Sequence, residues 1–173
     1  DTAEAVFVTA IPKEEMSQIL TAEKEKFLAI YGAVDPKVEF VLQETEKPAE
    51  VLRDDSARAL LQLLTLVHTG VFAMSTVIPT LMETSANLGV VRMTEGKIAV
   101  EYFPRSAVDG KLDEFIYAAK TLGDLLGFRA VIGTKSPGWK ENKQSVLAKM
   151  MADIFQEQNG KPMKVETIHD ELE

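Results

Sequence analysis

The chain has 173 residues, of which 46% are hydrophobic and 27% are charged, with a formal net charge of -8 from 27 acidic and 19 basic residues. This composition suits one large folded domain or two small ones that bury a core of their own. The acidic balance argues against nucleic acid or an anionic membrane as a partner, and no apolar run approaches the length of a membrane span. The absence of cysteine excludes disulfides, thiolate metal sites and a cysteine nucleophile.

The first third of the chain is predicted to contain a strand, a helix and a second strand. Residues 4–11 form a short run rich in β-formers, and Pro12 follows where the first turn of a helix tolerates proline. Apolar side chains then recur at helical spacing over residues 16–31, and Gly32 gives a stop signal. Residues 37–43 alternate apolar and polar side chains, which predicts a half-buried strand.

The middle third is predicted to contain a helix and a hairpin. A polar loop at 45–55 supplies capping residues for a helix whose apolar stripe runs through residues 60–67. Residues 71–87 fit no single period, and we expect a short strand or loop there with one helical turn. Two β-rich runs at 88–93 and 98–103 enclose a four-residue turn, which is typical of a β-hairpin.

The last third alternates helices and strands. Asp109 caps a predicted helix, and residues 128–133 follow it as a strand. A further helix carries apolar residues from 146 to 155 and stops at Gly160, and the chain closes on a short strand at 163–168. The order of elements predicts an α+β fold, with antiparallel sheet and helices on one face. This is the ferredoxin-like arrangement, present once or as two tandem halves.

The sequence holds too few ligands for a metal centre. A di-metal site needs about six to eight protein ligand atoms from His, Asp and Glu, whereas the chain has only the two histidines His68 and His169. His68 lies at the end of a predicted helix, where its ring can interact with the helix dipole, and His169 taken alone is most simply structural. No nucleophile elbow or phosphate-binding loop is present. We therefore expect no catalytic residue and no metal ligand in this chain.

Arg105 is the most interesting charged residue. It follows Pro104 at the end of an apolar predicted strand. A guanidinium in that place can hold a carboxylate with two charge-assisted hydrogen bonds. The simpler interpretation of Arg105 is a surface salt bridge, since such pairs are common.

Three segments carry a resemblance to a known family. Residues 71–91 read VFAMSTVIPTLMETSANLGVV, and residues 105–109 read RSAVD. Residues 137–169 hold Pro-Gly-Trp-Lys, a helix, a Gly-Lys-Pro segment and Ile-His in that order. Together these resemble the bacterial cytosolic aminoacyl-histidine (Xaa-His) dipeptidases, over essentially the whole chain. Ala107 departs from the family pattern by the loss of one hydroxyl.

The resemblance implies a two-part enzyme. A catalytic domain holds two zinc ions, and a lid domain inserted in it closes over the dipeptide and excludes water. Residues 1–135 would be the lid, which caps the substrate and dimerises, and residues 136–173 would return to the catalytic domain. The zinc ligands and catalytic groups would lie outside this chain, which would be inactive alone. We expect the chain to be cut from something longer, because its first residue is Asp1 rather than Met and an apolar run begins as early as Ala5.

The resemblance also implies which residues and partners matter. Arg105 would bind the substrate carboxylate, and His169 would be a second substrate-binding residue, although Asp170 and Glu171 replace the family's Ala-Gly beside it. The expected partners are the dipeptide, the chain's own catalytic domain and a second copy paired through an edge strand at 98–103, in the cytoplasm. The alternative is a free-standing ferredoxin-like regulatory module that binds an amino acid or a partner protein, because a fold of this kind serves several functions.

Overall fold

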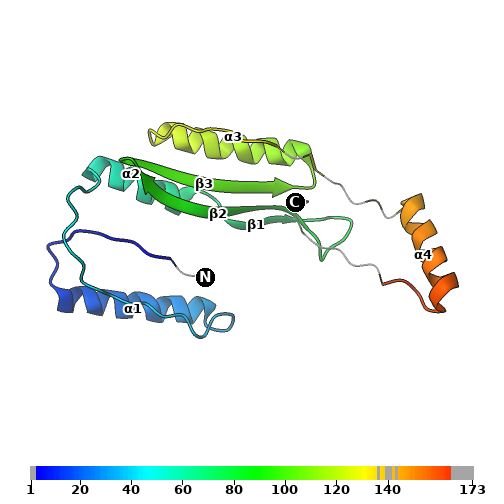
Figure 1. Ribbon diagram of the computed structural model, residues 1–173, viewed down its shortest axis with the longest axis horizontal. Helices are drawn as coiled ribbons and strands as arrows, with labels where there is room; N and C mark the ends of the chain where they lie inside the picture. Colours follow the sequence, from blue (N-terminus) through cyan, green and yellow to red (C-terminus); the bar gives the residue numbers. More distant parts are fainter. Residues whose placement is uncertain (1–2, 136, 139–141, 143, 165–173) are drawn as a thin grey trace. The chain divides into compact units, whose positions relative to one another are not determined.

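The computed structural model describes residues 3–135, 137–138, 142 and 144–164 (Figure 1). The chain divides into two compact units, residues 1–54 and residues 55–173. No helix among the described residues is long and apolar enough to cross a membrane.

The first unit is built on one long helix. Helix α1 spans Lys13–Tyr31, as predicted, and follows Pro12. The helix ends at Gly32, whose amide donates to the carbonyl of Leu28, and a Cβ at this position would lie only 2.4 Å from that carbonyl oxygen. The ring of Phe27 packs 5.8 Å from that of Phe40, centroid to centroid. None of the described residues of this unit is buried, so α1 makes side-chain contacts without packing against a buried core.

Three predicted strands are wrong. Residues 4–11, 37–43 and 128–133 lie outside any helix or strand of the structure. Each has the composition of a strand, but a strand is stabilised by the side chains of a paired neighbour, and composition alone does not supply one. The fourth, at 163–168, lies outside the described residues from 165 onward, and residues 163–164 are not in a strand.

The second unit is built on an antiparallel sheet. Helix α2 spans Asp54–Leu66, and it is followed by the strands β1 (Gly70–Met74), β2 (Met82–Thr94) and β3 (Lys97–Ser106). Among the described residues these strands form one sheet in the order β1-β2-β3 (Figure 1).

The predicted hairpin is confirmed as β2 and β3, and both strands are longer than expected. Glu95 and Gly96 form its two-residue turn, with φ angles of 52° and 70°. Two successive positive φ angles are typical of the type I′ turn that matches the twist of a hairpin. The irregular stretch 71–87 contains β1 and the beginning of β2, and its predicted helical turn is a non-helical turn at 75–81.

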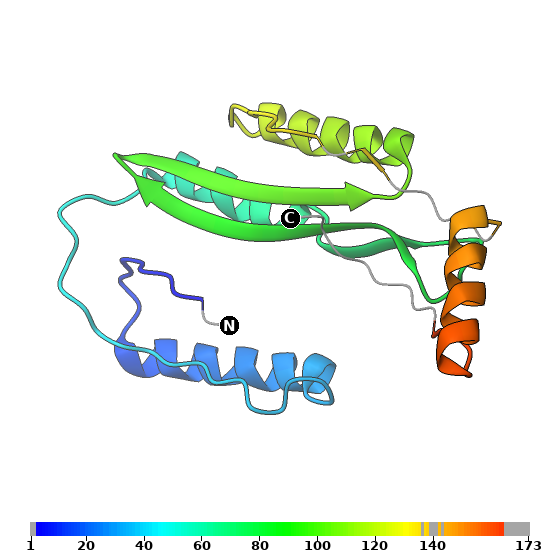
Figure 2. The same cartoon turned by 45° about the vertical axis from the view of Figure 1, so that its right-hand side comes forward.

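One face of the sheet is covered by helix α3 (Asp109–Leu125), which runs alongside β3 (Figure 2). Phe115 of α3 packs edge-on against Phe72 of β1, with ring centroids 4.6 Å apart. The ring of His68 joins them at 5.3 Å from Phe72 and 6.0 Å from Phe115. The apolar residues buried among the described ones all lie in this unit: Leu63, Ala86, Leu112 and Phe115.

The last helix, α4, spans Val146–Asn159. The hydroxyl of Ser145 accepts a hydrogen bond from the amide of Ala148 at its beginning, and Gly160 ends it in the left-handed conformation. Both ends are therefore capped. None of its residues is buried, and its large apolar side chains are exposed: Val146, Leu147, Met150, Met151 and Ile154.

Candidate functional site

Arg105 lies next to the end of β3, at the corner where the chain turns into α3. The register pairs it with Ser85 of β2, and pairs the next residue, Ser106, with Thr84. Thr84 and Ser106 are buried. Because successive side chains of a strand point to opposite faces, Arg105 lies on the face opposite to Thr84 and Ser106. We call this the distal face, and it carries Ser85, Asn87, Gly89, Phe103 and Arg105.

The backbone beside Arg105 is held by a buried hydroxyl pair. The Thr84 and Ser106 hydroxyl oxygens lie 2.9 Å apart, and Thr84 is only 1% exposed. The Ser106 hydroxyl also accepts a hydrogen bond from the Val108 amide at 3.1 Å. The Ala107 amide donates to the carbonyl of Glu83 at 2.9 Å. These contacts fix the residues on both sides of the hairpin end, and so the position of the strand end that carries Arg105.

The segment at 137–138 lies against this corner. The amide of Gly138 donates to a carboxylate oxygen of Asp109 at 2.7 Å. A Cβ on Gly138 would lie 2.6 Å from the carbonyl oxygen of Ala107, so only glycine permits this approach. An ion pair between Lys135 and Asp113, at 2.7 Å, holds the preceding residues to α3. The second and third segments of the resemblance therefore meet in space.

Ser75, from the first segment, has a structural role. It is 4% exposed, and its hydroxyl accepts hydrogen bonds from the amides of Val77 and Ile78, each at 3.1 Å. Its own amide donates to the carbonyl of Leu81 at 2.8 Å. The hydroxyl thus orders the turn between β1 and β2. Sequence reasoning missed the roles of Ser75, Thr84 and Ser106, and the available signal was a hydroxyl residue inside or beside an apolar strand.

The histidines do not form a metal site in the described residues. The ring of His68 packs against two phenylalanines as described above, and its carbonyl accepts a hydrogen bond from the Tyr102 hydroxyl at 2.8 Å. Burial raises the pKa of Tyr102 above its ordinary value. His169 lies outside the described residues. No three His, Asp or Glu side chains within the described ranges are placed to hold a metal ion, so these residues do not fit a zinc centre.

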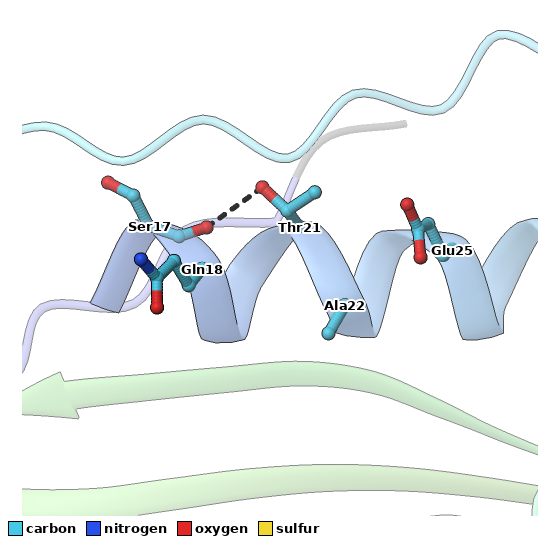
Figure 3. Close-up of a pocket in the computed structure, with 5 residues that line it drawn as sticks. All are labelled: Ser17, Gln18, Thr21, Ala22 and Glu25. Carbon is cyan, nitrogen blue, oxygen red and sulfur yellow. Dashed lines mark hydrogen bonds between the residues drawn. The ribbon is translucent and has the colours of Figure 1, made fainter. Parts of the chain in front are cut away.

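A shallow hollow lies along α1 (Figure 3). Its lining comes from this single helix: Ser17, Gln18, Thr21, Ala22 and Glu25. The Thr21 hydroxyl donates to the carbonyl of Ser17 at 2.8 Å, within the helix (Figure 3). Binding sites are usually concave and gather polar groups from several elements. The hollow is wide open and is lined by one helix, so the corner at Arg105 is the better candidate.

Comparisons with known proteins concern the chain as a whole. No family profile matches the chain. The chain is 28% identical over 178 residues to the cytosol non-specific dipeptidase of Escherichia coli (strain K12), a match that covers 95% of this chain and 36% of that protein. Its fold matches the crystal structure of aminoacylhistidine dipeptidase from Vibrio alginolyticus with a TM-score of 0.81 and 21% identity, covering 92% of this chain and 32% of that one. The α+β prediction is confirmed, and the chain spans about a third of the length of either protein.

Proposed function

We propose that this chain is the lid segment of a metal-dependent dipeptidase. The observation that carries the proposal is the match along 95% of the chain to about a third of a dipeptidase. The similarity favours this function over a free-standing regulatory module. In this proposal residues 1–135 cap the substrate, in an enzyme of the cytosol like the Escherichia coli relative, and the remaining part of the enzyme holds two zinc ions.

The metal ions in this proposal belong to residues beyond those described. Hydrolysis of a dipeptide by a zinc enzyme needs a set of ligands with an open coordination position. The described side chains offer no such set. The chain by itself should therefore show no turnover of dipeptides when zinc is added, whereas the longer polypeptide that contains it should.

Arg105 is the proposed substrate contact of the lid. Its strand end is held by the buried Thr84–Ser106 pair, so the guanidinium is presented from a fixed backbone. A guanidinium binds a carboxylate through two parallel hydrogen bonds, a geometry that lysine does not reproduce. We assign it the C-terminal carboxylate of the dipeptide. His169 remains the second proposed substrate-binding residue, on the resemblance alone.

Residues 136–173 are proposed to return to the catalytic domain, and α4 supports this. The helix is capped at both ends, yet the face that carries Leu147, Met150 and Ile154 is exposed. A helix of this length gains most of its stability from packing its apolar face. About two thirds of the relatives' length lies outside this chain, and the catalytic domain is the occupant that we assign to this face.

A homodimer through the lid is also proposed. Strand β3 is an edge strand of the described sheet, and it includes the residues 98–103 for which pairing was predicted. An edge strand presents backbone groups that can pair with a second chain, and a two-fold contact is the commonest closed arrangement.

The test of the carboxylate contact uses the longer polypeptide and a pair of matched substrates. Arg105→Ala should lower kcat/KM for a dipeptide by about ten- to a hundredfold, because a hydrogen bond to a charged group contributes about 1.5–3 kcal/mol. The loss should nearly vanish for the same dipeptide with an amidated C-terminus, which lacks the carboxylate charge. Arg105→Lys should recover only part of the activity.

The control is Arg92→Ala. Arg92 lies in the same hairpin and pairs with Glu101, so its loss removes an arginine without removing the proposed contact. An equal loss in both arginine variants, or an equal loss with the amidated substrate, would contradict the assignment of Arg105.

A further inference from the structure

After helix α3 the chain turns back and runs along the helix toward the corner that carries Arg105 (Figure 2, gold). The turn is made at Gly127, which has a φ of 78°. The Gly127 amide donates to the carbonyl of Asp124, and the Phe128 amide donates to the carbonyl of Gly123 at 2.8 Å. This pair of hydrogen bonds ends a helix around a left-handed residue and redirects the chain. The residues that follow are thereby brought back to the beginning of α3.

Two contacts fasten the returning chain to the first turns of α3. Lys135 forms its ion pair with Asp113 at 2.7 Å, and the Gly138 amide donates to the carboxylate of Asp109 at 2.7 Å. Asp109 is the first residue of the helix, and residues four positions apart lie on one face of a helix. Val108, not the predicted Asp109, is the N-cap residue. The carboxylate of Asp109 therefore holds a segment that is 29 residues away along the chain.

Gly138 also lies against the backbone of the two residues that follow Arg105. A Cβ built on Gly138 would lie 2.6 Å from the carbonyl oxygen of Ala107 and 3.0 Å from that of Ser106. A real Cβ does not approach a carbonyl oxygen to 2.6 Å, so any larger residue at position 138 would displace the segment. A shift of the segment would in turn change the contacts that hold the backbone beside the guanidinium.

We propose that Asp109 and Gly138 form a latch that positions Arg105 for the substrate carboxylate. The proposal rests on the proposed function, which makes Arg105 the carboxylate contact and residues 136–173 the return to the catalytic domain. The latch joins the segment that leads to that domain to the strand end that carries the guanidinium. A displacement of about 1 Å can lower a rate by about a hundredfold. Asp109 and Gly138 are therefore positioning residues, which affect activity without contact to the substrate.

A purely structural role for Asp109 makes a different prediction. A carboxylate in the first turn of a helix stabilises it through the helix dipole, and its loss would weaken the fold. Activity on every substrate would then fall by the same factor, with or without a carboxylate for Arg105 to bind. Asp109→Asn separates the two roles, because the amide oxygen still accepts a hydrogen bond from Gly138 while the negative charge is removed.

The experiment measures kcat/KM of the longer polypeptide on a dipeptide and on the same dipeptide with an amidated C-terminus. Asp109→Ala should lower the value for the free dipeptide about two- to tenfold, the size of one lost hydrogen bond, and change the value for the amidated one much less. Gly138→Ala, which keeps the carboxylate but displaces the segment, should have the same effect. Asp109→Asn should recover most of the loss. In the double variant Arg105→Ala/Asp109→Ala, the second change should lower kcat/KM no further, because the latch acts through the arginine.

Glu114→Ala is the matched control, because Glu114 is an exposed acidic residue of the same helix that pairs with Lys111 instead of the returning segment. It should leave both values unchanged. Equal losses on the free and amidated dipeptides in the Asp109 and Gly138 variants would overturn this inference and leave the assignment of Arg105 standing. Independent losses in the double variant would do the same. Failure of the unaltered longer polypeptide to hydrolyse any dipeptide would overturn both the inference and the proposed function.

Discussion

The two units of the chain hold their helices in different ways. In residues 55–173, α3 covers a sheet and buries Leu112 and Phe115 against it. In residues 1–54, α1 buries none of its residues, and the apolar side chains of Phe7, Ile30 and Val34 are exposed. A helix in water needs a packed apolar face for most of its stability. The second unit supplies that packing itself, whereas the described residues of the first do not.

The two units differ more in how their helices are stabilised than in their amino-acid composition. Both units contain phenylalanine rings in contact, a helix with a defined end, and long apolar residues. Among the described residues, only those of the second unit form paired strands, which bring distant side chains onto one face. The first unit is therefore expected to depend on surfaces beyond its own described residues, such as those of the proposed parent enzyme.

The largest expected difference in stability between the two units comes from removing one phenylalanine ring in each. Phe115→Ala should lower the free energy of unfolding by about 3–5 kcal/mol, because a buried ring is replaced by a cavity. Phe27→Ala removes a half-buried ring that contacts Tyr31 and Phe40, and should cost about 1 kcal/mol. Urea denaturation of both variants gives the comparison. Similar losses in the two variants would mean that the first unit has a core comparable to that of the second.

A smaller effect is expected from removing a hydroxyl in each unit. Thr84→Val should cost about 1–3 kcal/mol, because it leaves the Ser106 hydroxyl without its buried partner. Thr21→Val removes an exposed hydroxyl that bonds within α1 (Figure 3) and should change stability by about 0.5 kcal/mol or less. The double variant Thr84→Val/Ser106→Ala should cost less than the sum of its single changes. Additive costs would show that the two hydroxyls do not interact.

A smaller loss of stability than that of Thr84→Val is expected from Tyr102→Phe, and it depends on pH. Tyr102→Phe removes the hydrogen bond to the His68 carbonyl and should cost about 0.5–1.5 kcal/mol at neutral pH. Because burial raises the folded-state pKa of Tyr102 above 10.0, the unfolded chain loses this proton first as pH rises. Stability is therefore unaffected by this group below about pH 10 and falls as pH rises from there to the folded-state pKa.

Denaturation curves between pH 8 and 11.5 measure that dependence, and the phenylalanine variant should have a shallower alkaline slope than the unaltered chain. Tyr31→Phe, at an exposed position in the first unit, is the matched control at neutral pH and should leave stability unchanged. Parallel slopes for Tyr102→Phe and the unaltered chain would show that this tyrosine is not responsible for the alkaline loss.

The helices and the hairpin could be predicted from sequence because their signals are local. The stop at Gly32, the cap at Ser145 and the turn at Glu95–Gly96 each involve residues within a few positions of one another. The segments 4–11 and 37–43 have the residue composition of strands, yet neither forms one. A strand depends on a partner that is distant in sequence, and no pattern within the segment says whether that partner is there.

The candidate site was predictable in part for the same reason. Arg105 could be selected from its place at a strand end and from the resemblance, and the structure puts it next to the end of β3. The pairing of Thr84 with Ser106 spans 22 residues and follows from a register that includes a bulge. The packing of Phe103 over Gly89 depends on the same register. A change of one residue in pairing would move every one of these side chains to the other face.

The two-residue turn at Glu95–Gly96 has a consequence for the order of assembly. Hairpins form in about 1–10 μs, and contacts between residues close in sequence form before distant ones. Pairing of β2 with β3 therefore proceeds from Thr94 and Lys97 toward Thr84 and Ser106. The corner that carries Arg105 is therefore the last part of the hairpin to close, and the buried Thr84–Ser106 pair holds it once it has closed.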